Sequence, residues 1–319
     1  MGLFKMMRPG NCAMALLGVF IGALVELRSI FGLIYSNVGS RSTLDLFGIF
    51  NSPYWGLLSI LFPSYLRTPI LVPIFFAAIA AFLVTGAGNV LNDYYDAELD
   101  KKAHPERPIP SGQVSLKTAW GFAMALFAGG LILAVLVNWI CFIIAVVNTG
   151  LLFAYERSLK AKGLSGNRTI SYLTASVFLF GGAAVRSFIF VPVLFLLALL
   201  ANVGREITKD IEDMEADAAY RRTLPMILGR SSAARVAASY LYYAVILSFI
   251  PLIILLFIPM IVQIMGYISI VIMADFFFLS SIGIIEINPR EAQFYMKLGM
   301  MVAMIAFFLL GVLPGAFAI

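Results

Sequence analysis

The chain has 319 residues, of which 61% are hydrophobic and only 12% are charged. Soluble globular proteins carry roughly 25% charged residues, so this composition excludes an ordinary soluble domain and favours a protein of the lipid bilayer. The net charge of +5 could indicate nucleic acid binding, but in a membrane protein it more often reflects basic cytoplasmic loops. We therefore expect the bilayer, and no nucleic acid, as a partner.

Apolar segments long enough to cross a bilayer as helices recur along the chain. Such a helix needs roughly 20 predominantly apolar residues. We predict nine of them, at residues 11–33, 69–91, 116–137, 139–155, 170–186, 188–206, 232–254, 258–285 and 295–317. The predicted fold is all-α, a polytopic bundle that forms a single membrane-embedded domain over residues 1–319. Residues 34–68 are long for a connection, and we predict an amphipathic or re-entrant excursion there.

The basic residues predict the orientation of this bundle. All but four of the 22 Lys and Arg residues fall on the side of the N-terminus, and the exceptions are Arg28, Arg41, Arg67 and Arg186. Lys and Arg are enriched in cytoplasmic loops. We therefore predict a multi-pass protein of the cell membrane, with its N-terminus and its active site on the cytoplasmic side and its C-terminus outside.

Most of the 17 acids lie in two segments, residues 93–106 and 206–217. Each segment closes a predicted helix and is followed by basic residues and by a turn, "RPIPSG" or "RRTLPMILG". The recurrence predicts an internal duplication, with pseudo-repeats at about residues 1–137 and 139–254 followed by two further helices.

Each acidic segment places its polar side chains on one face of a helix. At about 100° per residue, four side chains of the first segment share an arc of about 100°: Asn92, Asp93, Asp96 and Asp100. Four acids of the second segment share an arc of about 60° around the helix: Glu206, Asp210, Asp213 and Asp217. Glu212 and Glu215 point to the opposite side of the second helix.

Stacked carboxylates repel one another and therefore need a counter-charge. Mg²⁺ takes one or two protein carboxylates together with waters and substrate phosphates. Two acidic faces could thus hold two Mg²⁺ ions bridged by a diphosphate. The alternative is that both segments are solvated loops whose acids only prevent aggregation.

Cations accompany both segments and the cytoplasmic end of the fourth predicted helix. They are Lys101, Lys102, Arg107, Arg205, Lys209, Lys160 and Lys162, with Tyr155 beside the last two. Lys binds phosphate as a point charge, and Arg can bind it with two hydrogen bonds. Taken singly, each could instead be a topology determinant only.

Four other residues could carry chemistry. We expect His104 to be a loop residue, because no partner pattern accompanies it. Cys12 and Cys141 have no metal-ligand spacing and are expected to be buried apolar residues. Asp275 lies near the middle of a predicted span, where an acid has either a functional or a hydrogen-bonded structural role.

Two pairs of motifs carry a resemblance to a known family. "NDYYDAELD" (Asn92 to Asp100) with "RPIPSG", and "KDIEDMEAD" (Lys209 to Asp217) with "TLPMILG", resemble the two Asp-rich motifs of the UbiA superfamily of intramembrane prenyltransferases. "MRPGN" (Met7 to Asn11) and "LKAKGLSGN" (Leu159 to Asn167) are also similar to family signatures. The resemblance implies nine membrane helices around a central cavity. It also implies Mg²⁺-dependent transfer of an isoprenyl chain from its diphosphate to an acceptor.

The resemblance also implies roles for residues at matching positions. The metal ligands would be Asn92, Asp96, Asp213 and Asp217, with Asp100 and Asp210 extending each stripe. Catalytic roles fall to Asp96 and Asp213 through the metal and to Tyr155, whose ring face could stabilise an allylic cation. The residues expected to bind diphosphate or phosphate are Arg8, Asn11, Lys101, Arg107, Lys160, Arg205 and Lys209.

The acceptor is predicted from a narrower resemblance. "GREITKDIEDMEAD" is most similar to the archaeal digeranylgeranylglyceryl phosphate synthases, which implies geranylgeranyl diphosphate as donor, geranylgeranylglyceryl phosphate as acceptor and a role in ether lipid biosynthesis. The alternative is an aromatic acceptor of quinone biosynthesis, such as 4-hydroxybenzoate or homogentisate. No obligate protein partner is evident.

Two other classes of protein fit the acids less well. A secondary transporter should place its ion ligands near the middle of the membrane, whereas these acids cluster at helix ends. A CDP-alcohol phosphotransferase also uses Mg²⁺ on carboxylates, but neither acidic stripe is followed by a "DGxxAR" element.

Overall fold

The computed structural model describes residues 2–37, 71–217, 222–256 and 261–312. Within these ranges every regular element is a helix and there is no strand, which confirms the predicted all-α fold. The predicted excursion at residues 34–68 lies outside the described residues from position 38 onward.

The described helices divide between two compact units. The first unit takes its residues from 1–23, 42–157 and 180–186, and the second takes the remainder. The first contains α1 (Gly2–Met6), the start of α2 (Pro9–Asn37), α5 (Leu71–Tyr95), α6 (Ala97–Ala103), α7 (Leu116–Val137) and α8 (Trp139–Ala154). A π-helical turn, η1 (Tyr155–Leu159), follows α8, and α9 (Leu164–Ala184) ends in this unit.

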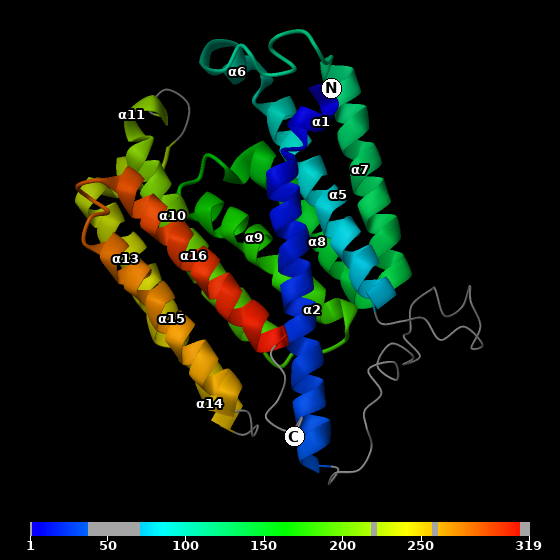
Figure 1. Ribbon diagram of the computed structural model, residues 1–319. Helices are drawn as coiled ribbons and strands as arrows, with labels where there is room; N and C mark the ends of the chain where they lie inside the picture. Colours follow the sequence, from blue (N-terminus) through cyan, green and yellow to red (C-terminus); the bar gives the residue numbers. More distant parts are fainter. Residues whose placement is uncertain (1, 38–70, 218–221, 257–260, 313–319) are drawn as a thin grey trace. The chain divides into compact units, whose positions relative to one another are not determined.

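The second unit contains the remaining helices. They are α10 (Val191–Glu212), α11 (Met214–Asp217), α12 (Leu224–Leu228), α13 (Arg230–Leu247), α14 (Ile250–Leu256), α15 (Ile261–Ile282) and α16 (Pro289–Val312). Figure 1 labels these helices in the colours of the sequence.

The first unit is built around α5, which packs against α7 and α8 (Figure 1). Small residues allow the close approach of α5 and α7. A Cβ atom on Gly130 of α7 would lie only 3.2 Å from the carbonyl oxygen of Ala80 and 2.7 Å from a methyl of Val84. Helices in membranes commonly associate through such small residues, because van der Waals packing is a main source of their attraction. This close approach fixes α5, the helix that leads into the first acidic segment, against α7.

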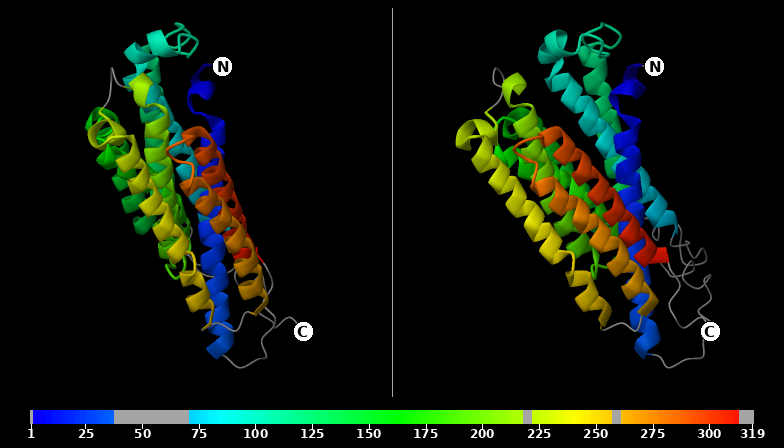
Figure 2. Two further views of the ribbon diagram at one scale, coloured as in Figure 1. Left: turned by 90° about the vertical axis from the view of Figure 1, so that its left-hand side faces the viewer. Right: turned by 60° about the vertical axis from the view of Figure 1, so that its left-hand side comes forward.

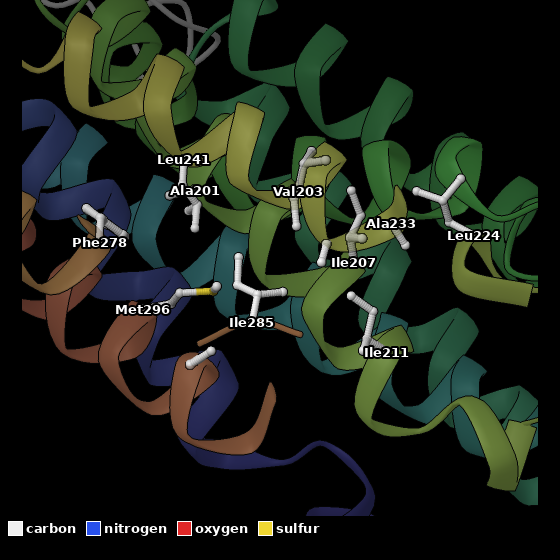
Figure 3. Packing of buried hydrophobic residues seen from close by; sticks show 13 residues of the cluster. Ala201, Val203, Ile207, Ile211, Leu224, Ala233, Leu241, Phe278, Ile285 and Met296 are labelled. Atoms are coloured by element: carbon white, nitrogen blue, oxygen red, sulfur yellow. The ribbon is translucent and has the colours of Figure 1, made fainter. Parts of the chain in front are cut away.

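The second unit has its own apolar core between α10, α13 and the α15–α16 pair. Ile207 and Ile211 of α10 are fully buried with Leu241 of α13 and Met296 of α16 (Figure 3). In both views of Figure 2, α15 and α16 run side by side. The core fixes the apolar face of α10, so the polar face of its last turns is left for the second acidic segment.

A buried carboxylate caps the other end of α10. Glu26 of α2 is fully buried and accepts backbone hydrogen bonds from Ile189 (2.9 Å), Phe190 (2.6 Å) and Val191 (2.7 Å). The hydroxyl of Ser187 donates to it as well. A helix start leaves N–H groups unpaired and carries partial positive charge, so a carboxylate stabilises it. This contact anchors the helix that ends in the second acidic segment.

Eight described helices are long and apolar enough to cross a membrane. They are Pro9–Leu27, Leu71–Tyr95, Leu116–Val137, Trp139–Leu159, Val191–Glu212, Arg230–Ile253, Met265–Ile282 and Pro289–Val312. The remaining predicted segment, residues 170–186, overlaps α9, which ends at Ala184 and begins with the polar stretch "LSGNRTISYL". The count of nine spans and the N-in, C-out orientation therefore stay predictions.

Candidate functional site

The first acidic segment continues the helical path of α5 into α6. The N–H of Asp96 donates to the carbonyl of Asn92 (2.9 Å), and the N–H of Asp100 donates to that of Asp96 (2.8 Å). These are the i to i−4 bonds of an α-helix, although Asp96 itself lies between the two helices. Asn92, Asp96 and Asp100 thus follow one another at intervals of one turn.

Two arginines pair with the buried acids of this segment. Nη2 of Arg8 donates to Oδ1 of Asp93 at 2.7 Å and to Oδ1 of Asn92 at 3.2 Å. Nη1 of Arg107 donates to both carboxylate oxygens of Asp100, at 2.7 and 2.8 Å, and lies 4.0 Å from Oδ1 of Asp93. Asp93 and Asp100 are only 5% and 4% exposed. A buried carboxylate needs such a partner, because an isolated buried charge is strongly unfavourable.

Glu156 joins the same network from the π-helical turn after α8. Nδ2 of Asn92 donates to Oε1 of Glu156 at 3.0 Å. Tyr155, the predicted cation-stabilising ring, precedes Glu156 in that turn and is partly buried. The sequence analysis missed Glu156, although π-helical turns inside helices are frequent at functional sites. The available signal was its place beside Tyr155 in "YERSLK".

The second acidic segment is held by amide side chains. Nδ2 of Asn167, in the "LSGN" stretch, donates to Oδ2 of Asp210 at 2.8 Å. Asp213 is the C-cap of α10 and is partly buried. On the other face, Glu212 accepts a hydrogen bond from Gln293 of α16. Asp217 is the last residue of α11, and its side chain lies outside the described part of the structure.

Other predicted phosphate-binding residues are spread over both units. Lys101 is exposed and pairs with Glu98 at 2.6 Å, and Asn11 is exposed in the first turn of α2. Lys160 is partly buried after η1. Arg205 pairs with Glu206, and Lys209 is exposed. Arg8 contacts Asn92 and Arg107 contacts Asp100, so the structure brings these two arginines to predicted metal ligands.

Three residues that the sequence analysis treated as peripheral have defined surroundings. His104 is exposed in the loop after α6, and its Nδ1 lies 3.6 Å from Glu106. Cys12 and Cys141 are fully buried, free thiols, as predicted.

Asp275 lies in a hydrogen-bonded group within the second unit. It is 7% exposed, and its Oδ2 lies 2.8 Å from the hydroxyl of Ser248. The hydroxyl of Tyr267 donates to the carbonyl of Ser248 at 2.9 Å. These contacts favour the hydrogen-bonded structural role for this acid.

The donor set can be compared with the needs of a metal ion. Among the described residues, no three His, Cys, Asp or Glu side chains are grouped so as to hold a metal by themselves. Mg²⁺ does not require such a group when phosphates and waters complete its shell. Asn92 and Asp96 in one segment, and Asp210 and Asp213 in the other, carry side-chain oxygens about one helical turn apart. The residues present therefore fit Mg²⁺ carried with a phosphorylated substrate.

Comparisons with known proteins identify the family. The profile of the UbiA prenyltransferase family matches residues 52–310. The chain belongs to this family. It is 38% identical over 311 residues to the digeranylgeranylglyceryl phosphate synthase of Methanosarcina mazei, covering 95% of this chain and 96% of that protein.

Solved structures agree with this assignment. One described under "Structural and mechanistic insights into the biosynthesis of Digeranylgeranylglyceryl phosphate synthase in membranes" has a TM-score of 0.72 and 29% identity, covering 98% of this chain and 99% of that one. A UbiA homolog from Archaeoglobus fulgidus bound to DMAPP and Mg²⁺ has a TM-score of 0.60 and 15% identity, with 98% of each chain covered, and shares the fold. The chain is thus a prenyltransferase and a multi-pass membrane protein. The transporter and CDP-alcohol phosphotransferase alternatives are set aside.

Proposed function

We propose that this prenyltransferase moves a geranylgeranyl group from its diphosphate to geranylgeranylglyceryl phosphate, a step of ether lipid biosynthesis. The observation that carries the proposal is the 38% identity to a digeranylgeranylglyceryl phosphate synthase over 95% of the chain. The cations near the acidic segments support it, because a phosphate-bearing acceptor adds negative charge beside a diphosphate. An aromatic acid would need at most one cation.

We further propose that Mg²⁺ is held by both acidic segments. The ligands would be Asn92, Asp96 and Asp100 from the first segment and Asp210, Asp213 and Asp217 from the second. When bound, the metal neutralises the diphosphate and makes it a better leaving group. Both oxygens of Asp100 accept hydrogen bonds from Arg107, so a metal role for Asp100 requires that one oxygen be released to the metal while the other still holds Arg107.

The chain's own groups then have distinct tasks. The phosphate groups of the substrates are bound by seven polar residues: Arg8, Asn11, Lys101, Arg107, Lys160, Arg205 and Lys209. The bond between C1 of the prenyl chain and the diphosphate oxygen breaks, and its electron pair leaves with the diphosphate. The ring face of Tyr155 stabilises the positive charge that develops on the allylic carbons. The acceptor hydroxyl oxygen forms the new ether bond with C1, and its proton leaves with the diphosphate.

The cellular setting completes the proposal. Apolar helices would shelter the prenyl chains, while the acids and cations at helix ends would meet the headgroups. The positive-inside pattern supports a cytoplasmic active site. The repeated arrangement of a helix followed by an acidic segment supports an internal duplication over residues of about 1–137 and 139–254.

The direct test uses the purified protein in detergent or liposomes. It is incubated with Mg²⁺, geranylgeranyl diphosphate and geranylgeranylglyceryl phosphate, and the products are read by mass spectrometry. We expect the mass of the acceptor plus one geranylgeranyl group. An active protein that prenylates a different acceptor, and gives no product from this one, would overturn the proposal.

A further inference from the structure

Two guanidinium groups converge on one buried carboxylate in the first unit. Oδ1 of Asp93 lies 2.7 Å from Nη2 of Arg8 and 4.0 Å from Nη1 of Arg107. The side chain of Asp93 is only 7% exposed, whereas those of Arg8 and Arg107 are 38% and 30% exposed. The acid is therefore inside, and the two cations lie between it and the exterior of the unit.

Each arginine uses one edge of its guanidinium to hold an acid. Arg8 donates through Nη2 to Asp93 and Asn92, and Arg107 donates through Nη1 to Asp100. An arginine has five N–H donors. Within the ranges that the structure describes, no acceptor contacts Nε or Nη1 of Arg8, or Nε or Nη2 of Arg107. These donors therefore remain available to an anion.

The backbone at Arg8 is held in an unfavourable conformation. Arg8 has a φ of +50°, in the left-handed region, between α1 and α2. Such a non-glycine residue persists only where its surroundings fix it, and such residues cluster at ligand-binding sites. Here the carbonyl of Met7 accepts hydrogen bonds from Nδ2 of Asn89 (2.8 Å) and from Sγ of Cys12 (3.1 Å). The start of the side chain and its guanidinium end are thus both fixed to α5.

We propose that Asp93 is a positioning residue that sets Arg8 and Arg107 side by side as a clamp for a phosphate group of a substrate. The inference rests on the proposed function, since it assumes phosphorylated substrates. Asp93 acts through the arginines and binds no metal, which distinguishes it from its neighbours Asn92 and Asp96. Two anchored guanidiniums suit a phosphate, because their remaining N–H groups can donate to several of its oxygens. The phosphate could belong to the prenyl diphosphate or to the acceptor.

The test compares Asp93→Asn, Arg8→Lys and Arg107→Lys with the wild-type protein. Initial rates are measured while the prenyl diphosphate, the phosphorylated acceptor and Mg²⁺ are varied in turn. Asn keeps the size of Asp and removes the charge that draws the arginines together. We expect a KM increase of about 10- to 100-fold for one phosphorylated substrate in all three variants, with the Mg²⁺ concentration for half-maximal rate unchanged. The substrate whose KM rises identifies the phosphate that is clamped.

Matched variants separate positioning from other roles. Glu106→Gln removes an exposed acid in the same segment and should leave both KM values unchanged. Asp93→Glu restores the charge and should recover part of the lost affinity. If Asp93→Asn does not fold, the KM values of Arg8→Lys and Arg107→Lys test whether the two arginines clamp a phosphate.

Three results would overturn the inference. One is an increased Mg²⁺ requirement in Asp93→Asn at unchanged KM values, which would make Asp93 a metal ligand. Another is a lower kcat with both KM values unchanged, and the third is wild-type kinetics. The wild-type reaction is the reference for the proposed function, so its failure with geranylgeranylglyceryl phosphate is recognised separately. In that event, the wild-type protein and the same variants are compared by the concentration of inorganic pyrophosphate that displaces a bound prenyl diphosphate.

Discussion

The two acidic segments are alike as sequences, but their side chains are held by different partners. In the first, buried Asp93 and Asp100 pair with Arg8 and Arg107. In the second, Asp210 accepts from an amide, that of Asn167. The two buried acids of the first segment thus have arginine counter-charges, whereas in the second segment an arginine pairs with Glu206 and an amide donates to Asp210.

Acids in similar motifs therefore need not share a role. A carboxylate whose oxygens are occupied by an arginine is already neutralised without metal. A neutral amide donor such as that of Asn167 occupies one lone pair of a carboxylate and adds no counter-charge. We therefore expect the acids of the first segment to divide between arginine-holding and metal-binding roles.

The largest effect is expected from the acids proposed to bind metal in each segment. Asp96→Ala and Asp213→Ala should each lower the rate of prenyl transfer by at least about 100- to 1,000-fold, because each removes charge stabilisation at the leaving diphosphate. Both variants should remain folded, as judged by monodispersity and thermal midpoint in detergent. Near-normal turnover in either variant would contradict a requirement for both segments.

A matched pair of isosteric substitutions tests the comparison through stability. Asp100→Asn removes a buried ion pair with two hydrogen bonds and should destabilise the fold by about 1.5–3 kcal/mol. Asp210→Asn weakens the hydrogen bond from Asn167, and the loss of this contact should cost about 0.5–1.5 kcal/mol. Thermal midpoints of the metal-free proteins provide the measurement. Equal losses in the two variants would show that the segments are not held differently.

The side of the second acidic segment opposite its acidic stripe should tolerate change. Glu212 contacts Gln293, and Glu215 is exposed. Glu212→Ala and Glu215→Ala should therefore alter the rate by only a few-fold, on the order of 1 kcal/mol or less. Steady-state rates would check this. Loss as severe as that of Asp213→Ala would mean that the helical phase assigned to this segment is wrong.

A labelling experiment with no expected effect on activity tests whether the segments share one side of the membrane. Cysteines introduced at Ser111 and Ala218 should react with an impermeant reagent from the same side, opposite to one introduced at Ser42. The two native thiols are buried and should give little background. Labelling of positions 42 and 111 from the same side would contradict the predicted topology.

Much of the fold follows from the sequence because apolar length and charge placement are local properties. The apolar runs predicted long helices, eight of which the structure shows to be long and apolar enough to span a membrane, and helical spacing placed Asn92, Asp96 and Asp100 on successive turns. The segment at 170–186 was harder to assign, because α9 begins with polar residues upstream of its apolar half.

The partners of the polar residues could not be predicted in the same way. Arg8 bonds to Asn92 and Asp93 across more than 80 positions, and helical periodicity carries no information on such pairs. Glu26 and Glu156 were missed for the same reason, since their roles depend on N–H groups and an amide from other helices.

The measurement closest to the central claim is a competition between acceptors. Purified protein receives Mg²⁺, geranylgeranyl diphosphate and equal concentrations of geranylgeranylglyceryl phosphate, 4-hydroxybenzoate and homogentisate, and each product is quantified by mass spectrometry. We predict that the glyceryl phosphate ether accounts for nearly all of the product and that it disappears when EDTA replaces Mg²⁺. Prenylated 4-hydroxybenzoate or homogentisate as the main product, or undiminished transfer in EDTA, would contradict the account.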